Sequence, residues 1–239
     1  MLSNDLYLLA ITAASIGFIH TVIGPDHYLP FIVISKARSW SIKKTMLVTA
    51  LCGIAHILSS VLLGIIGISM GLLLSKLKFI ESFRGNIAAW ALITFGLIYT
   101  VWALQKLYKN RVHQHAHVHQ DGSTHTHEHG HHHAHSHIHI DEKNQFSITP
   151  WVLFIIFVLG PCEPLIPILM YPAAKNSMFG MILITSVFGI TTILTMTSIV
   201  LASTFGLTFV SLGRLEKYSN VLAGLLIFSS GLAIQYFGL

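Results

Sequence analysis

Apolar positions dominate the chain and fall into runs of membrane-spanning length. Two of these runs, residues 6–35 and 148–174, carry one acid each, Asp26 and Glu163. The others contain no Asp, Glu, Lys or Arg and cover residues 46–75, 85–105, 176–213 and 218–239. Each run reaches the roughly 20 residues that a helix needs to cross the hydrocarbon core of a bilayer. The pattern therefore predicts an all-α membrane protein with six transmembrane helices.

Two of the predicted spans are interrupted by a Gly-Pro pair, Gly24-Pro25 in the first and Gly160-Pro161 in the fourth. Proline has no amide hydrogen and clashes with the carbonyl four residues earlier, so a helix kinks or breaks there. Freed backbone groups at membrane depth are tolerated only against protein or a wet cavity. We therefore expect two broken helices, each opening onto a polar site.

The two breaks also suggest an internal repeat. When the chain is offset by 136 residues, Gly24-Pro25 falls on Gly160-Pro161, and Asp26-His27 falls on Cys162-Glu163. Because each half has three spans, the second half must enter the membrane from the opposite face, as in the inverted repeats of secondary transporters. We assign residues 1–110 to the first three-helix repeat, 111–147 to a His-rich cytoplasmic loop and 148–239 to the second repeat. A chance match of two Gly-Pro helices is the alternative.

Composition and charge placement fix the class and predict the orientation. The chain is 53% hydrophobic and 10% charged with a mean hydropathy of +0.69, which excludes a soluble domain. Ten of the 14 basic residues lie on the side that holds the 111–147 loop, and the positive-inside rule makes that side cytoplasmic. Both termini are then outside. Met1–Asp5 has no basic n-region, so we expect no cleaved signal peptide. The basic residues form no stripe that would bind nucleic acid.

Thirteen of the 16 histidines lie between residues 113 and 139. Such a tract cannot bury a core, so we expect it to stay disordered unless it is loaded with metal. Imidazole is a common ligand of zinc, copper, nickel and iron, which favours an auxiliary metal-binding loop over a solubilising linker. Its histidines are His113, His115, His117, His119, His125, His127, His129, His131, His132, His133, His135, His137 and His139.

The remaining histidines and a few other polar residues are candidates for an intramembrane metal site. Ionisable groups in a span are costly and usually face a protein-lined cavity. Gly53 and Ala55 beside the second-span histidine favour close helix packing there. We predict the metal ligands to be His20, Asp26, His27, His56, Cys162 and Glu163.

These residues resemble a known family. His20, Asp26-His27, a glycine- and histidine-bearing second span and a His-rich loop are similar to the nickel/cobalt transporter family, whose signature is His, four residues, then Asp-His. Here five residues separate His20 from Asp26. The Pro-Asp-His form is closer to the urease-associated nickel permeases, and the His-rich loop is closer to the nickel and cobalt efflux branch. The resemblance implies a six-span transporter in which His20, Asp26 and His27 recognise the metal.

A second, shorter resemblance involves Gly160-Pro161-Cys162-Glu163-Pro164. It resembles the Pro-Cys helix of membrane thiol-electron carriers and the Pro-containing helices of sulfite exporters. Two alternatives therefore stay open beside metal transport. One is a sulfite-type anion exporter, because a half-helix that starts at a proline offers free amides to an anion. The other is a membrane thiol-redox protein that uses Cys52 and Cys162.

The main hypothesis is a secondary transporter of a divalent transition metal, nickel or cobalt first and zinc next, with efflux favoured over uptake. The sequence contains no Gly-rich Lys-Ser/Thr loop for ATP, so an ion gradient or a partner would supply the energy, with Asp26 and Glu163 as proton-coupling groups. We expect no enzymatic activity and no cofactor. The expected partners are the metal ion and the lipid bilayer, and the sequence leaves the oligomeric state undetermined.

Overall fold

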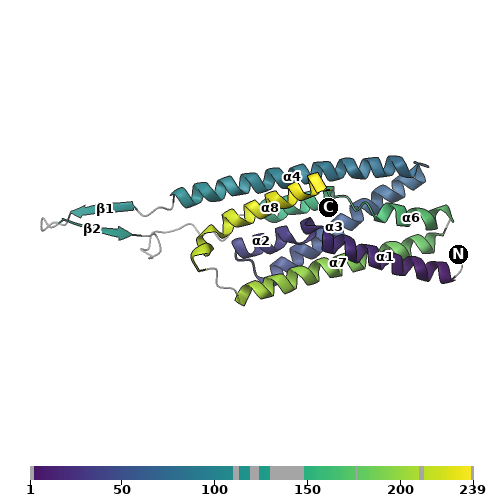
Figure 1. Ribbon diagram of the computed structural model, residues 1–239, viewed down its shortest axis with the longest axis horizontal. Helices are drawn as coiled ribbons and strands as arrows, with labels where there is room; N and C mark the ends of the chain where they lie inside the picture. The colour runs from purple at the N-terminus through teal and green to yellow at the C-terminus, as the bar shows by residue number, and fades with distance from the viewer. Residues whose placement is uncertain are drawn as a thin grey trace.

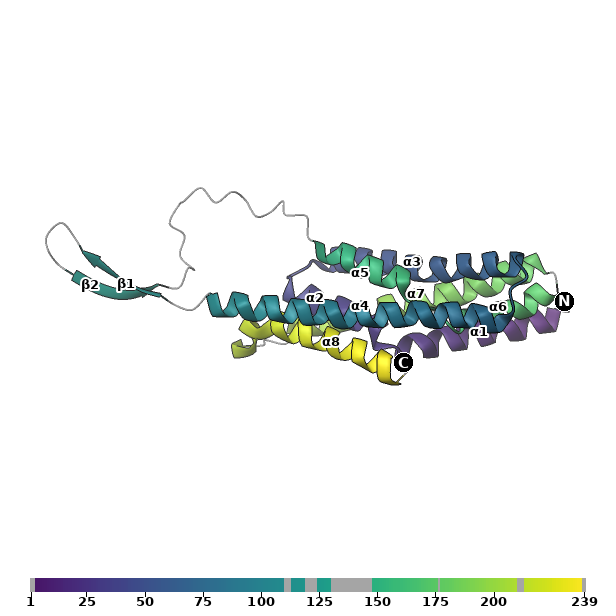
Figure 2. The same cartoon turned by 90° about the horizontal axis from the view of Figure 1, so that it is seen from above.

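A computed structural model describes residues 3–109, 113–118, 124–129, 148–175, 177–209 and 213–237. Its helices run along one common axis and form an elongated bundle, with a β-hairpin projecting from one end (Figures 1 and 2). In chain order the elements are α1 (Ser3–Ile23), η1 (Pro25–His27), α2 (Leu29–Ala37), α3 (Ile42–Ser69), α4 (Leu74–Lys109), β1 (His113–Val118), β2 (Thr124–His129), α5 (Ile148–Leu159), α6 (Leu165–Ala174), α7 (Met178–Phe209), η3 (Gly213–Tyr218) and α8 (Ser219–Phe237).

Five of the described helices are long and apolar enough to cross a membrane: α1, α3, α4, α7 and α8, the last together with part of η3. The fourth predicted span is divided into α5 and α6, which are both too short to cross alone. Helix length therefore supports five spans, and a sixth span requires α5 and α6 to cross the membrane as one interrupted helix. The all-α membrane class is confirmed for the bundle.

Both predicted helix breaks are present. The regular ladder of α1 ends with the Gly24 N–H donating to His20 O at 3.0 Å, and a single 3-10 turn, η1, follows at Pro25–His27. A Cβ at Gly24 would lie 2.6 Å from His27 Nδ1, so only glycine leaves room for that ring. The second break separates α5 from α6 between Leu159 and Leu165. Each predicted Gly-Pro pair thus interrupts a helix within the bundle.

The histidine tract is partly ordered. Strands β1 and β2 pair antiparallel, with His113 opposite His129, His115 opposite His127 and His117 opposite His125. We predicted no regular structure here. An alternating sequence suits a two-stranded ladder, because its period matches the two-residue repeat of a strand. The other predicted loop ligands, His119, His131, His132, His133, His135, His137 and His139, lie outside the described residues.

The contact between α4 and α8 is made by glycines that let the two backbones approach closely. A Cβ at Gly231 would lie 2.9 Å from Ile93 N and 3.2 Å from Ala89 O, and one at Gly96 would collide with the backbone of Phe228. Small residues are favoured between membrane helices because they allow such approach.

We expect Gly231→Val to destabilise the protein by about 1–3 kcal/mol, because the added atoms overpack this interface. Gly206→Val on α7 is the matched control, since a Cβ at Gly206 meets nothing within 4 Å. Unfolding of both variants in detergent, followed by circular dichroism, measures the difference. Equal stability of the two would contradict the packing argument.

Candidate metal centre

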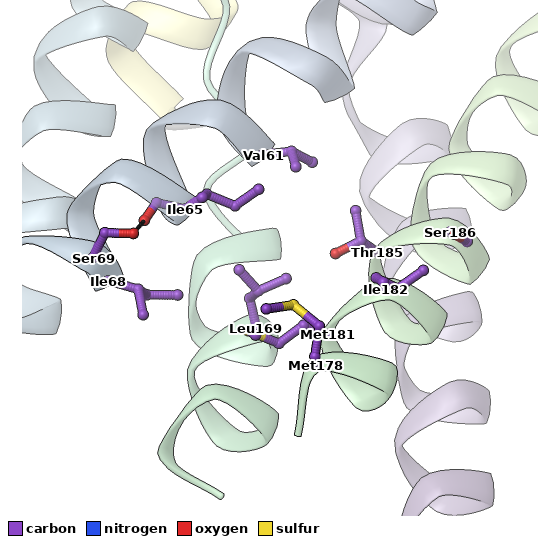
Figure 3. A pocket seen from close by; sticks show the side chains of 10 residues that line it. All are labelled: Val61, Ile65, Ile68, Ser69, Leu169, Met178, Met181, Ile182, Thr185 and Ser186. Atoms are coloured by element: carbon purple, nitrogen blue, oxygen red, sulfur yellow. Dashed lines mark hydrogen bonds between the residues drawn. The ribbon is translucent and has the colours of Figure 1, made fainter. Parts of the chain in front are cut away.

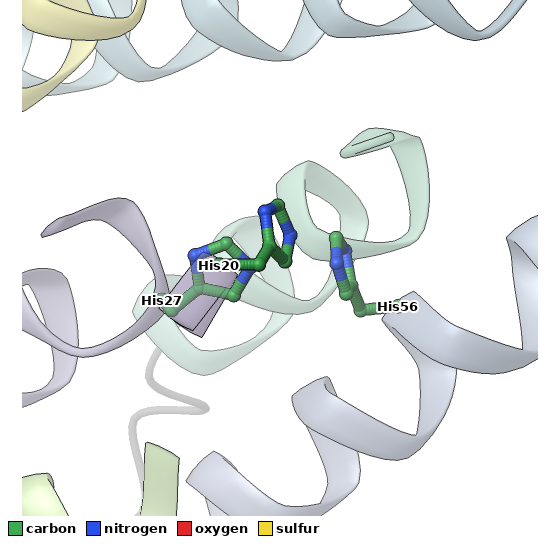
Figure 4. Close-up of side chains that lie close together, drawn as sticks. All are labelled: His20, His27 and His56. Carbon is green, nitrogen blue, oxygen red and sulfur yellow. The ribbon is translucent and has the colours of Figure 1, made fainter. Parts of the chain in front are cut away.

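Three histidines from two helices and the first break converge in the middle of the bundle. His20 lies in the last turn of α1, His27 ends η1 and His56 lies on α3. One ring nitrogen from each can be chosen so that all three lie within 4.8 Å of one another. The ring centroids of His27 are 4.7 Å from His20 and 5.2 Å from His56, and both pairs are edge-on (Figure 4). The break brings His27 back toward His20, and α3 supplies the third ring.

Hydrogen bonds at Nδ1 orient two of the rings. His27 Nδ1 lies 3.1 Å from Gly24 O and 3.1 Å from Asp26 Oδ1, and His56 Nδ1 lies 3.4 Å from Phe157 O. These partners are carbonyl or carboxylate oxygens, which only accept, so Nδ1 carries the proton in both rings. The lone pair of a neutral ring is then on Nε2.

The Nε2 atoms of His20, His27 and His56 are all buried and have no hydrogen-bond partner among the described residues. Buried polar atoms are normally paired, and each exception needs an explanation. Three neighbouring imidazoles with unpaired buried nitrogens are a donor set that zinc, copper, iron and nickel accept. The arrangement can therefore hold a transition metal with one or more positions left for water or a further ligand.

Asp26 lies beside this cluster. Its carboxylate is 30% exposed and accepts from His27 Nδ1 at 3.1 Å, so it helps to orient that ring. Carboxylates that bind the far nitrogen of a ligating histidine fix its tautomer and raise its basicity. Asp26, predicted as a metal ligand, thus contacts the cluster as the hydrogen-bond partner of His27.

We expect Asp26→Ala to lower metal affinity by roughly 10–100-fold, because His27 loses the partner that orients it. Asp26→Asn keeps an acceptor oxygen and should lose less. Equilibrium titration of purified protein with Zn²⁺ measures both, and Asp5→Asn near the start of α1 is the control. An unchanged affinity of Asp26→Ala would show that Gly24 O alone positions the ring.

Glu163 and Cys162, the candidates from the second break, are placed differently from each other. Glu163 is exposed to a cavity of about 420 Å³ that is also lined by His20, Asp26 and His27, and by Ser82, Gly85 and Asn86 of α4. Cys162 is fully buried in an apolar cluster with Leu165 and Phe188. Of the six predicted ligands, the structure therefore brings three histidines together, places both carboxylates beside the cavity and leaves the thiol in the core.

Sequence analysis missed an ion pair on α4, Glu81 with Arg84, which contacts Ser59 and Ser60 of α3 close to His56. Glu81 is 0% exposed, and its Oε1 accepts from Arg84 Nη1 at 2.7 Å. We began the third span at residue 85, which leaves both residues outside it, whereas α4 begins at Leu74 and carries them into the bundle. Their three-residue spacing, which places both side chains on one face of a helix, was the available signal.

Another cavity, of about 350 Å³, lies between α3, α6 and α7 (Figure 3). Its lining is apolar apart from Ser69, Thr185 and Ser186, and it contains no charged side chain or imidazole. It therefore offers no ligand set for a metal ion, which leaves the three-histidine cluster as the candidate centre in the described residues.

Comparison with known proteins identifies the family. A model of the cytochrome c biogenesis protein transmembrane region matches residues 30–233. The chain belongs to this family. Together with the apolar helices, this makes it an integral membrane protein. No curated protein and no solved structure matches the chain.

The resemblance to the nickel/cobalt transporter family is therefore wrong. It depended on His20, Asp26 and His27, a short pattern whose spacing already departs from the signature by one residue. All three residues lie before the matched segment, which begins at residue 30, whereas His56, Cys52 and Cys162 lie inside it. The family match instead fits the thiol-redox alternative and gives no support to nickel or cobalt transport.

Proposed function

We propose that this protein binds a divalent first-row transition metal at His20, His27 and His56 and carries it through the membrane, acting without a catalytic step or a resident cofactor. The observation that carries the proposal is the set of three buried Nε2 atoms without partners. Because a buried polar group that stays unpaired costs free energy, an ion that accepts all three lone pairs would explain why the fold keeps them together.

The chemistry of the surroundings favours a cation. Asp26 and Glu163 line the same cavity as His20 and His27 and would offset the charge of a divalent ion. All-imidazole ligation suits zinc, nickel and copper, whereas magnesium and calcium prefer oxygen. A sulfite-type anion would face two carboxylates here, so the anion-exporter alternative is disfavoured.

The packing supports an inverted repeat around this site. The helices α1, α2, α3 and α4 can be exchanged in order with α5, α6, α7 and α8. Three contacts between the two halves then recur: α1 on α7 matches α5 on α3, α2 on α8 matches α6 on α4, and α2 on α7 matches α6 on α3. Helices α3 and α4 contact their own counterparts, α7 and α8. We infer six crossings in two halves of opposite direction, with the site between the two breaks.

The end of the bundle that bears the hairpin is proposed to face the cytoplasm. There Lys36 Nζ donates to Leu207 O at 3.2 Å, and Arg38 Nε donates to the Tyr99 hydroxyl at 3.1 Å. These cations join α2 to the end of α7 and to α4, so the basic residues anchor one common end. A cytoplasmic histidine tract would collect metal for efflux.

We expect the tract to be auxiliary to transport. Replacing its thirteen histidines with asparagine should lower the number of metal ions bound per chain while leaving transport in place, because the three-histidine site is separate from the tract. Metal content and uptake into proteoliposomes measure the two effects. Complete loss of transport by this folded variant would locate the essential site in the tract.

The test uses the purified chain with all thirteen histidines of the tract replaced by asparagine. This tract-asparagine background removes metal binding by the tract. Zn²⁺, Ni²⁺ and Co²⁺ are titrated in detergent, and metal flux is followed in proteoliposomes. We expect one tight site per chain and metal-dependent flux. If the protein binds no metal tightly, or binds it equally well when His20, His27 and His56 are all replaced with glutamine, the proposal fails.

A second candidate is a membrane thiol-redox function, which the family match favours. In this conformation the two thiols are separate. Cys52 packs with Phe31 and Met196, whereas Cys162 N–H donates to Ser60 Oγ, eight residues further along α3. A disulfide needs Cα atoms within about 7 Å, so direct pairing would require rearrangement of the second break.

Thiol alkylation of membranes with and without reductant distinguishes the two candidates. A redox protein should show Cys52 or Cys162 protected until it is reduced, and its activity should be lost in Cys52→Ser or Cys162→Ser. The metal-transport proposal expects both serine variants to retain metal binding and flux.

A further inference from the structure

We propose that Arg84 is a positioning residue for the three-histidine site, acting through the second helix break. The inference rests on the proposed metal binding. It assigns a purpose to Arg84, a partly buried cation that α4 carries into the bundle.

The break at Gly160-Pro161 removes the usual donors from the end of α5. Phe157 O would accept from residue 161 and Gly160 O from residue 164, but both of those residues are prolines without an N–H. Val158 O would accept from Cys162 N–H, which instead donates to Ser60 Oγ at 3.1 Å. Val158 O and Gly160 O thus lose their usual intrahelical donors, and Phe157 O keeps only the backbone bond from the Gly160 N–H at 3.2 Å.

Side chains from α3 and α4 replace those donors. One Arg84 nitrogen, Nη2, lies 2.9 Å from Val158 O, 3.3 Å from Gly160 O and 2.8 Å from Ser59 Oγ. The other, Nη1, donates to the buried Glu81 carboxylate at 2.7 Å, which compensates the charge. The planar guanidinium can serve several acceptors at once in a fixed arrangement, which the single ammonium of lysine cannot copy.

The same segment also holds a metal-site ring. Phe157 O, one residue before Val158, is the acceptor for His56 Nδ1 at 3.4 Å. A Cβ at Gly160 would lie 3.2 Å from that same Nδ1. By holding the two carbonyls that follow this contact, those of Val158 and Gly160, Arg84 fixes the distance between the end of α5 and the His56 ring, and so keeps His56 in place beside the other two histidines.

Substitution of Arg84 should therefore lower the metal affinity of the site as well as the stability of the fold. Loss of a partner that orients a ligating histidine typically costs roughly 10–100-fold in metal affinity. Arg84→Gln should fall in this range, and Arg84→Lys should lie between Arg84→Gln and the unchanged chain, because lysine keeps the charge but reaches fewer carbonyls. Gly160→Ala should also weaken binding, because its methyl group crowds His56 without altering Arg84.

The experiment titrates the full-length chain with Co²⁺ in the tract-asparagine background and records the visible spectrum of the bound ion, which reports the ligand geometry. Thermal unfolding of each variant is measured in parallel, and Lys78→Gln on the same helix is the control. We expect Arg84→Gln and Gly160→Ala to shift both the affinity and the spectrum of the folded fraction, and Lys78→Gln to shift neither.

The titration distinguishes a failure of metal binding by the unchanged chain from a failure of the role assigned to Arg84. If the unchanged chain binds no Co²⁺ tightly, the proposed function fails. If it binds Co²⁺, and Arg84→Gln lowers only the unfolding temperature while affinity and spectrum stay unchanged, Arg84 is merely structural and the inference is overturned. If Arg84→Gln does not fold, Arg84→Lys decides it by the same two readouts.

Discussion

His27→Gln should lower metal affinity by more than about 100-fold and abolish metal flux. The reason is that His27 supplies one of three lone pairs, and loss of a ligand should exceed the roughly 10–100-fold cost of losing a partner that only orients one. Glutamine is close in size and polar, so the buried position is filled without a cavity. Binding is measured by Zn²⁺ titration and flux by uptake into proteoliposomes, both in the tract-asparagine background.

Tyr28→Phe is the matched control for this prediction. Its hydroxyl, next along the chain, donates to Val22 O at 3.2 Å and takes no part in the histidine cluster. The control should bind and transport as the unchanged chain does. Retention of tight binding by correctly inserted His27→Gln would show that the three-imidazole cluster is not the metal site.

Glu81→Ala should destabilise the protein by about 3–5 kcal/mol, because removing one partner leaves a buried charge without compensation. The carboxylate is fully buried and accepts from Arg84 Nη1 and Ser60 Oγ. Without it the guanidinium of Arg84, which is 17% exposed, loses the carboxylate with which it is paired. Glu81→Gln keeps an acceptor oxygen and should lose less stability.

The measurement is the free energy of unfolding in mixed detergent micelles, with Ser82→Ala as the control. Ser82 is the exposed neighbour of Glu81 on α4. The control should change stability by less than about 0.5 kcal/mol, as surface substitutions usually do. A loss of under 1 kcal/mol in Glu81→Ala would mean that Arg84 finds enough compensation in the carbonyls of the second break.

The family assignment shows how far a short motif can mislead. His20, Asp26 and His27 suggested one transporter family, but the match that identifies the chain begins after them and extends over most of its length. The resemblance rested on three side chains, whereas a family model weighs every position along the helices. The local chemistry of those side chains is unaffected by the correction, because it depends on their positions in the fold.

The sequence by itself determined the membrane class, the two breaks and the identity of the three intramembrane histidines. These follow from local properties: the length of apolar runs, the missing amide of proline and the cost of an ionisable group in hydrocarbon. Even the hairpin pairing in the tract follows the alternation of its residues, although we expected disorder there.

Only the tertiary structure decided which candidates meet. His56 joins His20 and His27 because α3 packs beside the break, while Cys162, next to Glu163 in the chain, is directed into the apolar core. Asp26 pairs with His27, and Arg84 lies within the bundle because α4 starts eleven residues earlier than predicted, at residue 74 instead of 85. Which face of each helix contacts its neighbours depends on packing between residues far apart in sequence, and no local pattern encodes that choice.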